Sequence, residues 1–328
     1  SVAQAVTATY AGSMKIGAEF ESADDSTVDS NTVMDQSNFN ISLSETTDAG
    51  TTISTSFEIV DEGTVAADDD NAIKLTFSDG SALELLNAGN AAGTHAAAVP
   101  GAGGEQGIAG TSNNNAPTGI DFAAGSTALG VEWHSAADFM ADGLKVSASI
   151  STDDGSAKGA TPRTENSWGV GATYVTTAGD TTLTIGGGYG AGETAKTGTA
   201  APDPENFNIG VSAVTGDLTV GVAFGDGDQV NDEGGSSYEQ VDGSVVTAGI
   251  KYVTGDITLA LGATAGEAKD STTMGTAGTT DDSVDSVGAS VTYSVASGVS
   301  AVLGYTTADR NNEGASTTDG GTAWYVGA

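Results

Sequence analysis

The chain has no cysteine, few prolines and few basic residues. Its 328 residues include five prolines, two histidines and nine Lys or Arg against 44 Asp or Glu, so the formal net charge is -35. Without cysteine there is no disulfide framework and no thiol chemistry, which fits an oxidising compartment without requiring one. The shortage of Lys and Arg argues against nucleic acid as a partner, because binding a phosphate backbone depends on these residues.

Long hydrophobic runs and enzyme motifs are also missing. With a mean hydropathy of -0.09, no stretch approaches the roughly 20 apolar residues that a membrane helix needs. A β-strand that shows only one face to lipid has a much weaker hydropathy signal, so a membrane location stays open. The two histidines and the absence of G-x-S-x-G, H-E-x-x-H and P-loop patterns argue against an enzyme. No Pro-rich or Ser-rich linker divides residues 1–328, which predicts a single domain.

Apolar residues instead alternate with polar ones along hairpins. Tyr174 to Gly188 reads YVTTAGDTTLTIGGG, Ala213 to Phe224 reads AVTGDLTVGVAF, and Tyr252 to Gly262 reads YVTGDITLALG. In each, an alternating stretch reaches a small Gly-containing turn and resumes the same alternation beyond it. Such turns join antiparallel neighbours.

The same pattern over the whole chain predicts sixteen strands. An even number allows an antiparallel sheet to close with all short turns on one rim and all long loops on the other, as in transmembrane β-barrels. The fold class expected is therefore an all-β, 16-stranded antiparallel transmembrane β-barrel with short periplasmic turns and long extracellular loops. The strands are expected near 6–21, 38–46, 51–61, 71–78, 80–88, 127–135, 143–152, 167–177, 180–190, 205–214, 217–226, 244–254, 256–265, 285–295, 298–308 and 320–328.

Aromatic residues near the strand ends support this interpretation. Eight are expected near the loop-side rim and five near the short-turn rim, all on the apolar face of their strands, as interfacial girdles would be. The opposite face is polar or small, as in Ser147, Ser149 and Ser151. A barrel of this size is too wide for side chains to fill and encloses an aqueous channel.

These features resemble the general diffusion porins of Gram-negative bacteria, in particular the acidic, Gly-rich porins of alphaproteobacteria. The resemblance rests on the strand number and order, on KLTFSDGSALEL from Lys74 to Leu85, and on GTAWYVGA from Gly321 to Ala328. It implies an outer-membrane homotrimer surrounded by lipopolysaccharide, with a water-filled channel for passive diffusion of small hydrophilic solutes and ions. The family usually ends on an aromatic residue, whereas this sequence ends at Ala328. Ser1 to Ala5 (SVAQA) resembles the end of a cleaved signal peptide, so the chain is treated as exported and mature.

The resemblance also implies a constriction loop after the fifth strand. The long segment there, with residues 89–125 as the probable pore-constricting part, is rich in Gly, Ala and Asn and has Glu105, Asp121 and His95 as its titratable groups. The alternative is that this segment is an exposed loop outside the barrel.

Charged residues at inward-facing strand positions predict a cation-preferring pore. Acids outnumber bases there, and rings of carboxylates favour cations. The residues expected to line the pore or its constriction are Lys15, Glu19, Glu58, Lys74, Glu84, Glu105, Asp121, Glu132 and Lys145.

Acidic clusters in the long loops allow a second function class. Asp68, Asp69 and Asp70 are candidates for weak calcium binding, although their spacing matches no regular calcium motif, and a solvated acidic surface is the simpler interpretation. No other cofactor is expected. The alternative class is a secreted or surface-layer adhesive protein, which explains the acidity but not the one-sided split of turns and loops.

Overall fold

The computed structural model describes residues 6–23, 30–61, 73–85, 91–101, 129–152, 163–195, 203, 205–232, 238–272, 281–311 and 321–328. Within these residues the chain is almost entirely β-strand, with one short helix. No helix in this part of the chain is long and apolar enough to cross a bilayer.

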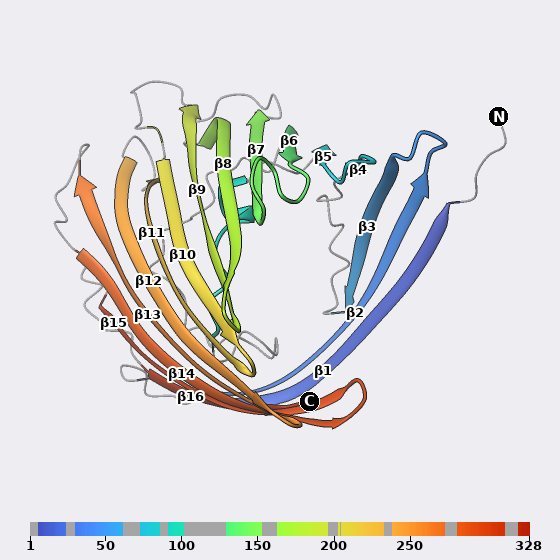
Figure 1. The fold of residues 1–328 in the computed structure, drawn as a ribbon. Coiled ribbons are helices and arrows are strands. Elements are labelled where there is room, and N and C mark those ends of the chain that lie inside the picture. Colours follow the sequence, from blue (N-terminus) through green and yellow to red (C-terminus); the bar gives the residue numbers. More distant parts are fainter. Residues whose placement is uncertain are drawn as a thin grey trace.

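Sixteen antiparallel strands form a closed barrel in which each strand pairs with its sequence neighbours and β1 pairs with β16 (Figure 1). This confirms the predicted fold class and strand number. The elements are β1 (Thr7–Ala23), β2 (Ser30–Thr46), β3 (Thr52–Asp61), β4 (Ile73–Thr76), β5 (Ala82–Leu85), α1 (Ala91–Thr94), β6 (Leu129–His134), β7 (Leu144–Thr152), β8 (Arg163–Ala178), β9 (Thr181–Ala195), β10 (Glu205–Thr215), β11 (Leu218–Asp232), β12 (Tyr238–Thr254), β13 (Ile257–Thr272), β14 (Asp281–Ala296), β15 (Val299–Asn311) and β16 (Gly321–Gly327).

Seven short turns connect alternate strand pairs, as the sequence predicts. Each contains one glycine with a positive φ: Gly50, Gly80, Gly143, Gly179, Gly216, Gly255 and Gly298. Residues with a Cβ adopt that backbone conformation only at a cost, whereas glycine adopts it readily. The glycines therefore set the position of each turn and, through it, the register of each hairpin.

Closure joins the two ends of the sequence. The strand register places Gly17 opposite Gly327 and Glu19 opposite Tyr325. Beyond the last strand residue, Ile16 and Ala328 exchange both backbone N–H···O bonds, at 3.0 and 2.9 Å. The pairing of β1 with β16 gives hydrogen-bond partners to the backbone N–H and C=O groups that would stay unpaired at the edges of an open sheet.

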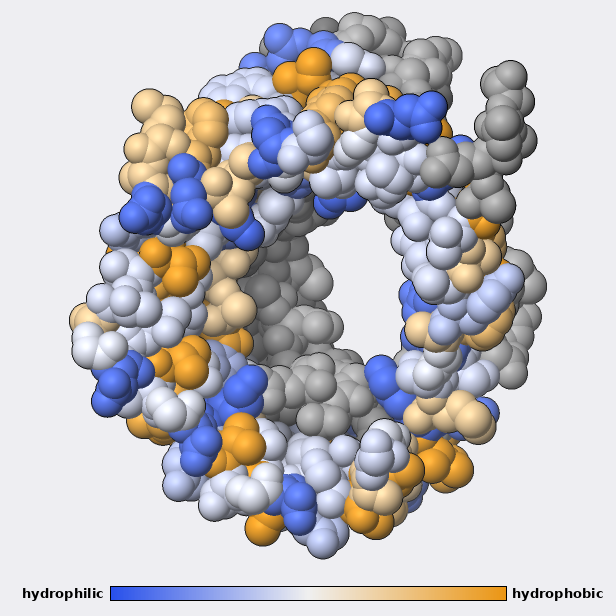
Figure 2. All heavy atoms as spheres, turned by 45° about the vertical axis from the view of Figure 1, so that its right-hand side comes forward, coloured by the Kyte–Doolittle hydropathy of each residue, from blue (hydrophilic) through white to orange (hydrophobic). Residues whose placement is uncertain are grey.

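The two faces of the barrel differ as the alternation predicts. Large apolar side chains project outward and stay exposed, for example Ile150 at 60%, Ile209 at 55% and Leu303 at 51%. Aromatic rings on this face contact one another across strands, with ring centroids 5.5 Å apart for Trp168 and Tyr189. The inner face is mostly polar or small, and Figure 2 shows an opening through the ring of strands.

Several strands extend further towards the loop side than the sequence pattern indicates. The strand expected at 38–46 begins at Ser30, and the strand expected at 217–226 continues to Asp232. Asp35, outside the expected strand 38–46, therefore lies within β2. Phe39 lies in the middle of β2, and its ring stacks on that of Tyr10 with a centroid distance of 5.9 Å. The apolar alternation ends in these regions, but the backbone ladder needs no apolar side chains to continue.

Candidate functional site

A short chain segment lies inside the barrel against its inner wall. Residues 91–101 begin with α1, which contacts β7, β8, β9 and β10 (Figure 1). Ala91 and Ala92 are buried, at 0% and 1% exposed. We call residues 91–101 the lumen segment. It belongs to the predicted constriction loop 89–125, whose other residues lie outside the described part of the chain.

Inward-facing glycines form the surface on which the lumen segment lies. A Cβ at Gly171 would overlap the Ala91 carbonyl oxygen, and one at Gly188 would overlap the Ala92 Cα. The backbone of the segment therefore occupies space that any side chain at these positions would fill. The remaining glycines of this surface are Gly169, Gly186, Gly210, Gly221 and Gly249. For the last four, an added Cβ would lie within 3.0 Å of an atom of the lumen segment. A Cβ at Gly169 would lie 3.3 Å from the Ala92 backbone nitrogen and 3.0 Å from Ser149 Oγ, which is bonded to the segment.

Polar side chains of the wall bind the first turn of the lumen segment. Ser149 Oγ accepts a hydrogen bond from the Ala91 backbone N–H at 3.0 Å, and Asn208 Nδ2 donates to the Ala92 carbonyl oxygen at 3.0 Å. Thr94 Oγ1 donates to Glu132 Oε1 at 2.7 Å. A four-residue helix leaves most of its terminal backbone groups without internal partners, and these wall residues supply some of them.

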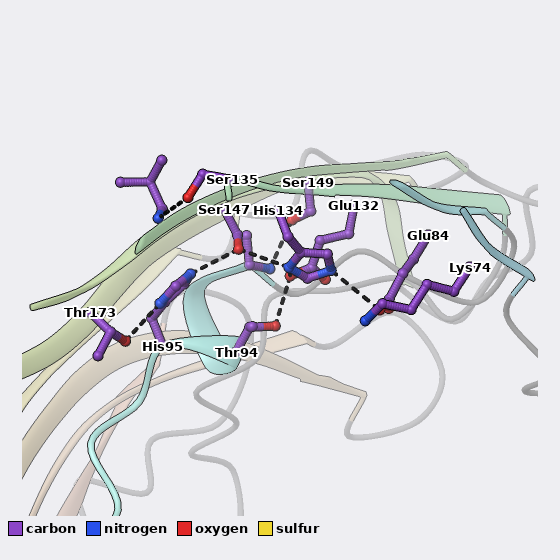
Figure 3. Close-up of polar contacts among 12 residues, drawn as sticks. Lys74, Glu84, Thr94, His95, Glu132, His134, Ser135, Ser147, Ser149 and Thr173 are labelled. Atoms are coloured by element: carbon purple, nitrogen blue, oxygen red, sulfur yellow. Dashed lines mark hydrogen bonds and ion pairs between the residues drawn. The ribbon is translucent and has the colours of Figure 1, made fainter. Parts of the chain in front are cut away.

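His95 follows the helix and points into the wall (Figure 3). The side chain is 6% exposed. Its Nδ1 lies 2.7 Å from Thr173 Oγ1 and its Nε2 lies 2.8 Å from Ser147 Oγ, so both ring nitrogens are hydrogen-bonded. His95 lies outside every strand, and burial, together with the nearby charges of His134 and Lys145, lowers the pKa of its ring below the ordinary value.

Beside His95, charged side chains of β4, β5 and β6 form a cluster. Lys74 Nζ donates to Glu84 Oε1 at 2.6 Å. His134 lies between two carboxylates, with Nε2 at 3.4 Å from Glu84 Oε1 and Nδ1 at 3.7 Å from Glu132 Oε1. The Nε2 contact has ion-pair distance but not hydrogen-bond geometry, since this buried nitrogen has no hydrogen-bond partner among the described residues. Glu132 is 4% exposed.

The structure thus brings together three of the predicted pore residues, Lys74, Glu84 and Glu132, with Lys145 close to His95. It does not bring Lys15, Glu19 or Glu58 to this cluster. Glu58 lies on β3, where Asn40 Nδ2 donates to its Oε1 at 3.5 Å. Lys15 and Glu19 lie on β1, separated from β5 by three strands.

Other predicted residues lie outside the described part of the chain. These are Glu105 and Asp121 of the constriction loop and the calcium candidates Asp68, Asp69 and Asp70. Within the described residues, no group of three or more His, Asp or Glu side chains is arranged to hold a metal ion. Calcium binding by the loops stays a prediction.

The sequence pattern missed three parts of this site. The strand alternation places His134 at an inward-facing position but does not show that it lies close to His95. Ser147 and Thr173 were not assigned a role beyond the polar face. The third part is the glycine-rich stretch at Gly186 to Gly190, since glycines at alternate positions of neighbouring strands are a signal for close backbone approach.

Comparisons with known proteins identify the class of barrel. Solved structures that align with the chain include the trimer form of OmpT, an outer membrane protein of Vibrio cholerae, at 15% identity, 99% coverage of both chains and a TM-score of 0.62. A mutant of the Rhodopseudomonas blastica porin aligns at 14% identity, 98% and 99% coverage and a TM-score of 0.61. The outer membrane channel DcaP of Acinetobacter baumannii aligns at 12% identity, 98% and 96% coverage and a TM-score of 0.61. At such identities these matches show the fold alone.

None of the curated proteins matches the chain. The family model for Gram-negative porins matches residues 1–313, which is nearly the whole chain. Together with the closed sixteen-strand barrel and its apolar outer face, this match shows that the chain is a bacterial outer-membrane protein of the Gram-negative porin family.

Proposed function

We propose that this porin is a cation-preferring channel for the passive diffusion of small hydrophilic solutes and ions, narrowed by the lumen segment. Carboxylates on the inner wall favour cations over anions. The strong net negative charge of the chain raises the local concentration of cations around both mouths.

The charge balance of the cluster on β4, β5 and β6 is the observation that carries this proposal. Glu84 and Glu132 are direct cross-strand neighbours. The cluster on β4, β5 and β6 pairs these two carboxylates with one lysine, Lys74. Lys74 lies 2.6 Å from Glu84, so these two charges largely cancel at a distance. With neutral histidines the three groups sum to one negative charge, which attracts an entering cation and repels an anion.

Reversal potentials in a planar bilayer under a KCl gradient test the proposal. We expect a potential of the sign given by K⁺ permeating faster than Cl⁻. Glu132→Gln removes one of the two carboxylates and is expected to lower the permeability ratio, while Asp256→Asn, in a short turn at the rim, serves as the matched control. A reversal potential of the opposite sign in the unmodified protein contradicts the proposal.

We also propose that the functional unit is a homotrimer in lipopolysaccharide. The aligned OmpT of Vibrio cholerae has been solved in a trimer form. Light scattering of the detergent-purified chain tests the assembly, and a monomeric mass for the folded, conducting protein contradicts it.

Outward carboxylates above the aromatic rim support contact with lipopolysaccharide. On β14 and β15, Asp285 and Asp309 are direct cross-strand neighbours, and both are exposed. They border a shallow hollow of about 300 Å³ on the outer face, whose apolar lining includes Val246 and Val287. Further outward carboxylates at this level are Glu193, Glu205, Asp226, Asp242 and Glu267.

Divalent cations would connect these carboxylates to lipid phosphates, because both groups are anionic and oxygen ligands suit Ca²⁺ and Mg²⁺. Thermal unfolding with lipopolysaccharide and Mg²⁺ tests this. We expect lipopolysaccharide to raise the Tm more in the presence of Mg²⁺ than with a chelator, and Asp285→Asn with Asp309→Asn to reduce that difference. Equal stabilisation with and without Mg²⁺ contradicts this part of the proposal.

A further inference from the structure

The only two histidines of the chain share one serine hydroxyl. Ser147 Oγ, on β7, lies 2.8 Å from His95 Nε2 of the lumen segment and 2.9 Å from His134 Nδ1 at the end of β6 (Figure 3). Ser147 is 4% exposed, so solvent hardly reaches this hydroxyl. The bridge connects the lumen segment to the charged cluster on the wall.

Both hydrogen bonds of Ser147 can form when the rings of His95 and His134 are neutral. A neutral imidazole has one N–H donor and one acceptor nitrogen, and a serine hydroxyl donates one proton and accepts others. Ser147 therefore donates to one ring and accepts from the other. At the far side of His95, the Thr173 hydroxyl either donates or accepts, so both ring tautomers fit.

Two protonated rings do not fit. Each would donate to Ser147 Oγ, and the serine proton would need another acceptor, whereas the described hydrogen bonds of this oxygen are those to the two rings. Two positive charges would also meet across one oxygen atom with low solvent exposure. Like charges in such a place repel strongly because water screens them little.

The other charges around the bridge do not balance a proton on His95. Glu84 and Glu132 lie beside His134, and Lys74 is bound to Glu84. Lys145 of β7 is close enough to act on His95. The described inward-facing residues of β8, β9 and β10 are uncharged.

We propose that His95 positions the lumen segment on the wall through the bridge to Ser147 and His134, and that protonation of both histidines releases it. The segment on the wall leaves the widest bore, and a released segment enters the lumen. Acid therefore lowers the conductance and makes it fluctuate. This inference rests on the proposed function in one respect, namely that the lumen segment narrows the channel.

The direction of the pH dependence follows from linkage. The docked ring of His95 has a lowered pKa, whereas the released ring has the ordinary value near 6.5. Docking is thus strongest above about pH 6.5, where the His95 ring is neutral in both the docked and the released state. Below that pH the docking equilibrium constant falls, by up to about tenfold per pH unit.

A spin label on the lumen segment tests the release without measuring conduction. The chain has no cysteine, so Ala96→Cys gives one labelling site on an exposed side chain two residues beyond α1. We expect the label to become more mobile as the pH falls from about 7.5 to about 4.5, roughly the range in which histidines titrate. His95→Phe, which cannot form the bridge, is expected to give a mobile label at every pH. His134→Gln removes the second charge, and the transition should move to lower pH.

A reversible disulfide provides the matched control. A Cβ at Gly210 would lie 2.7 Å from the Ala97 Cβ and 2.8 Å from the Ala223 Cβ, so these two alanines lie near each other across the boundary between segment and wall. A small shift brings the Cβ atoms of Ala97→Cys and Ala223→Cys to the roughly 3.5–4.5 Å that a disulfide needs. In single-channel recordings in acid, the oxidised variant should keep the neutral-pH conductance. After reduction it should show the acid-dependent decrease.

The outcomes distinguish release from narrowing. A label equally immobile at neutral and acid pH in the otherwise unmodified protein overturns the inference, and so does an identical transition in His134→Gln. A mobile label at acid pH with unchanged conductance supports the release but contradicts the narrowing role assigned to the lumen segment. Heat-modifiable migration in gels shows for each variant that the barrel has folded.

Discussion

Substituting Gly171 by alanine is the most direct test of how the lumen segment is seated. The added Cβ would overlap the Ala91 carbonyl oxygen and would lie 2.8 Å from His95 Cδ2 and 3.0 Å from His95 Cβ. Non-bonded carbon atoms are most stable about 3.5–4.0 Å apart, so the segment must move away from β8 by roughly 1 Å.

That displacement costs free energy in two ways. Overpacking by one methyl group typically costs about 1–3 kcal/mol. The bonds of His95 to Thr173 and Ser147, at 2.7 and 2.8 Å, would stretch beyond hydrogen-bonding range, and each contributes about 0.5–1.5 kcal/mol. We expect docking to weaken by about 2–6 kcal/mol in total, which is roughly 30-fold to 25,000-fold in the docking equilibrium.

The assay is the mobility of a spin label at Ala96→Cys at neutral pH, together with the single-channel conductance. Gly171→Ala should give a more mobile label and a lower, noisier conductance than the unsubstituted channel. Gly12→Ala is the matched control, because its Cβ would meet only the Asn38 carbonyl oxygen at 3.3 Å and the Phe39 ring at 3.9 Å, away from the lumen segment. If both variants behave like the parent protein, the glycine surface does not determine the position of the segment.

Two further predictions concern the stability of the barrel. Asp79 accepts hydrogen bonds from Ser81 N and Oγ at 2.9 and 2.7 Å, which lower the pKa of this turn carboxyl below its ordinary 3.8. The ionised form of Asp79 therefore stabilises the turn above that pH. Asp79→Asn should lower the Tm at neutral pH. The difference in Tm between the parent protein and this variant should shrink as the pH falls below 3.8. Gly304→Ala would place a Cβ within the ring of Tyr325, which is 1% exposed, so this variant should fold poorly, as measured by heat-modifiable gel migration. A fully folded Gly304→Ala barrel would show that Tyr325 can leave this position.

Much of the fold followed from local pattern. The alternation around Ile250 and Tyr252 assigned the outward face, and the small turns at Gly216 and Gly255 placed hairpins within one or two residues of where they lie. The alternation did not show where strands end on the loop side. There β2 continues back to Ser30, because neither face of a strand beyond the lipid band has to be apolar.

The site could be predicted only in part. Inward parity placed Lys74, Glu84 and Glu132 on the inner wall, and adjacent pairing of β4, β5 and β6 made their contact foreseeable. The meeting of His95 with His134 was not foreseeable, because it depends on how a long segment without strand periodicity folds back into the barrel. Nothing in the residues around His95 specifies that path locally.

By itself, the sequence determined that this protein is a sixteen-strand membrane barrel with an apolar outside, a polar inside and glycine turns. The two faces and the turns depend on residues two apart or directly joined by a turn, and the even strand number allows the sheet to close. The tertiary structure alone decided which inner surface receives residues 91–101 and which polar groups meet there. The reason is that seven glycines from five strands, far apart in the chain, become one continuous surface only after the barrel closes.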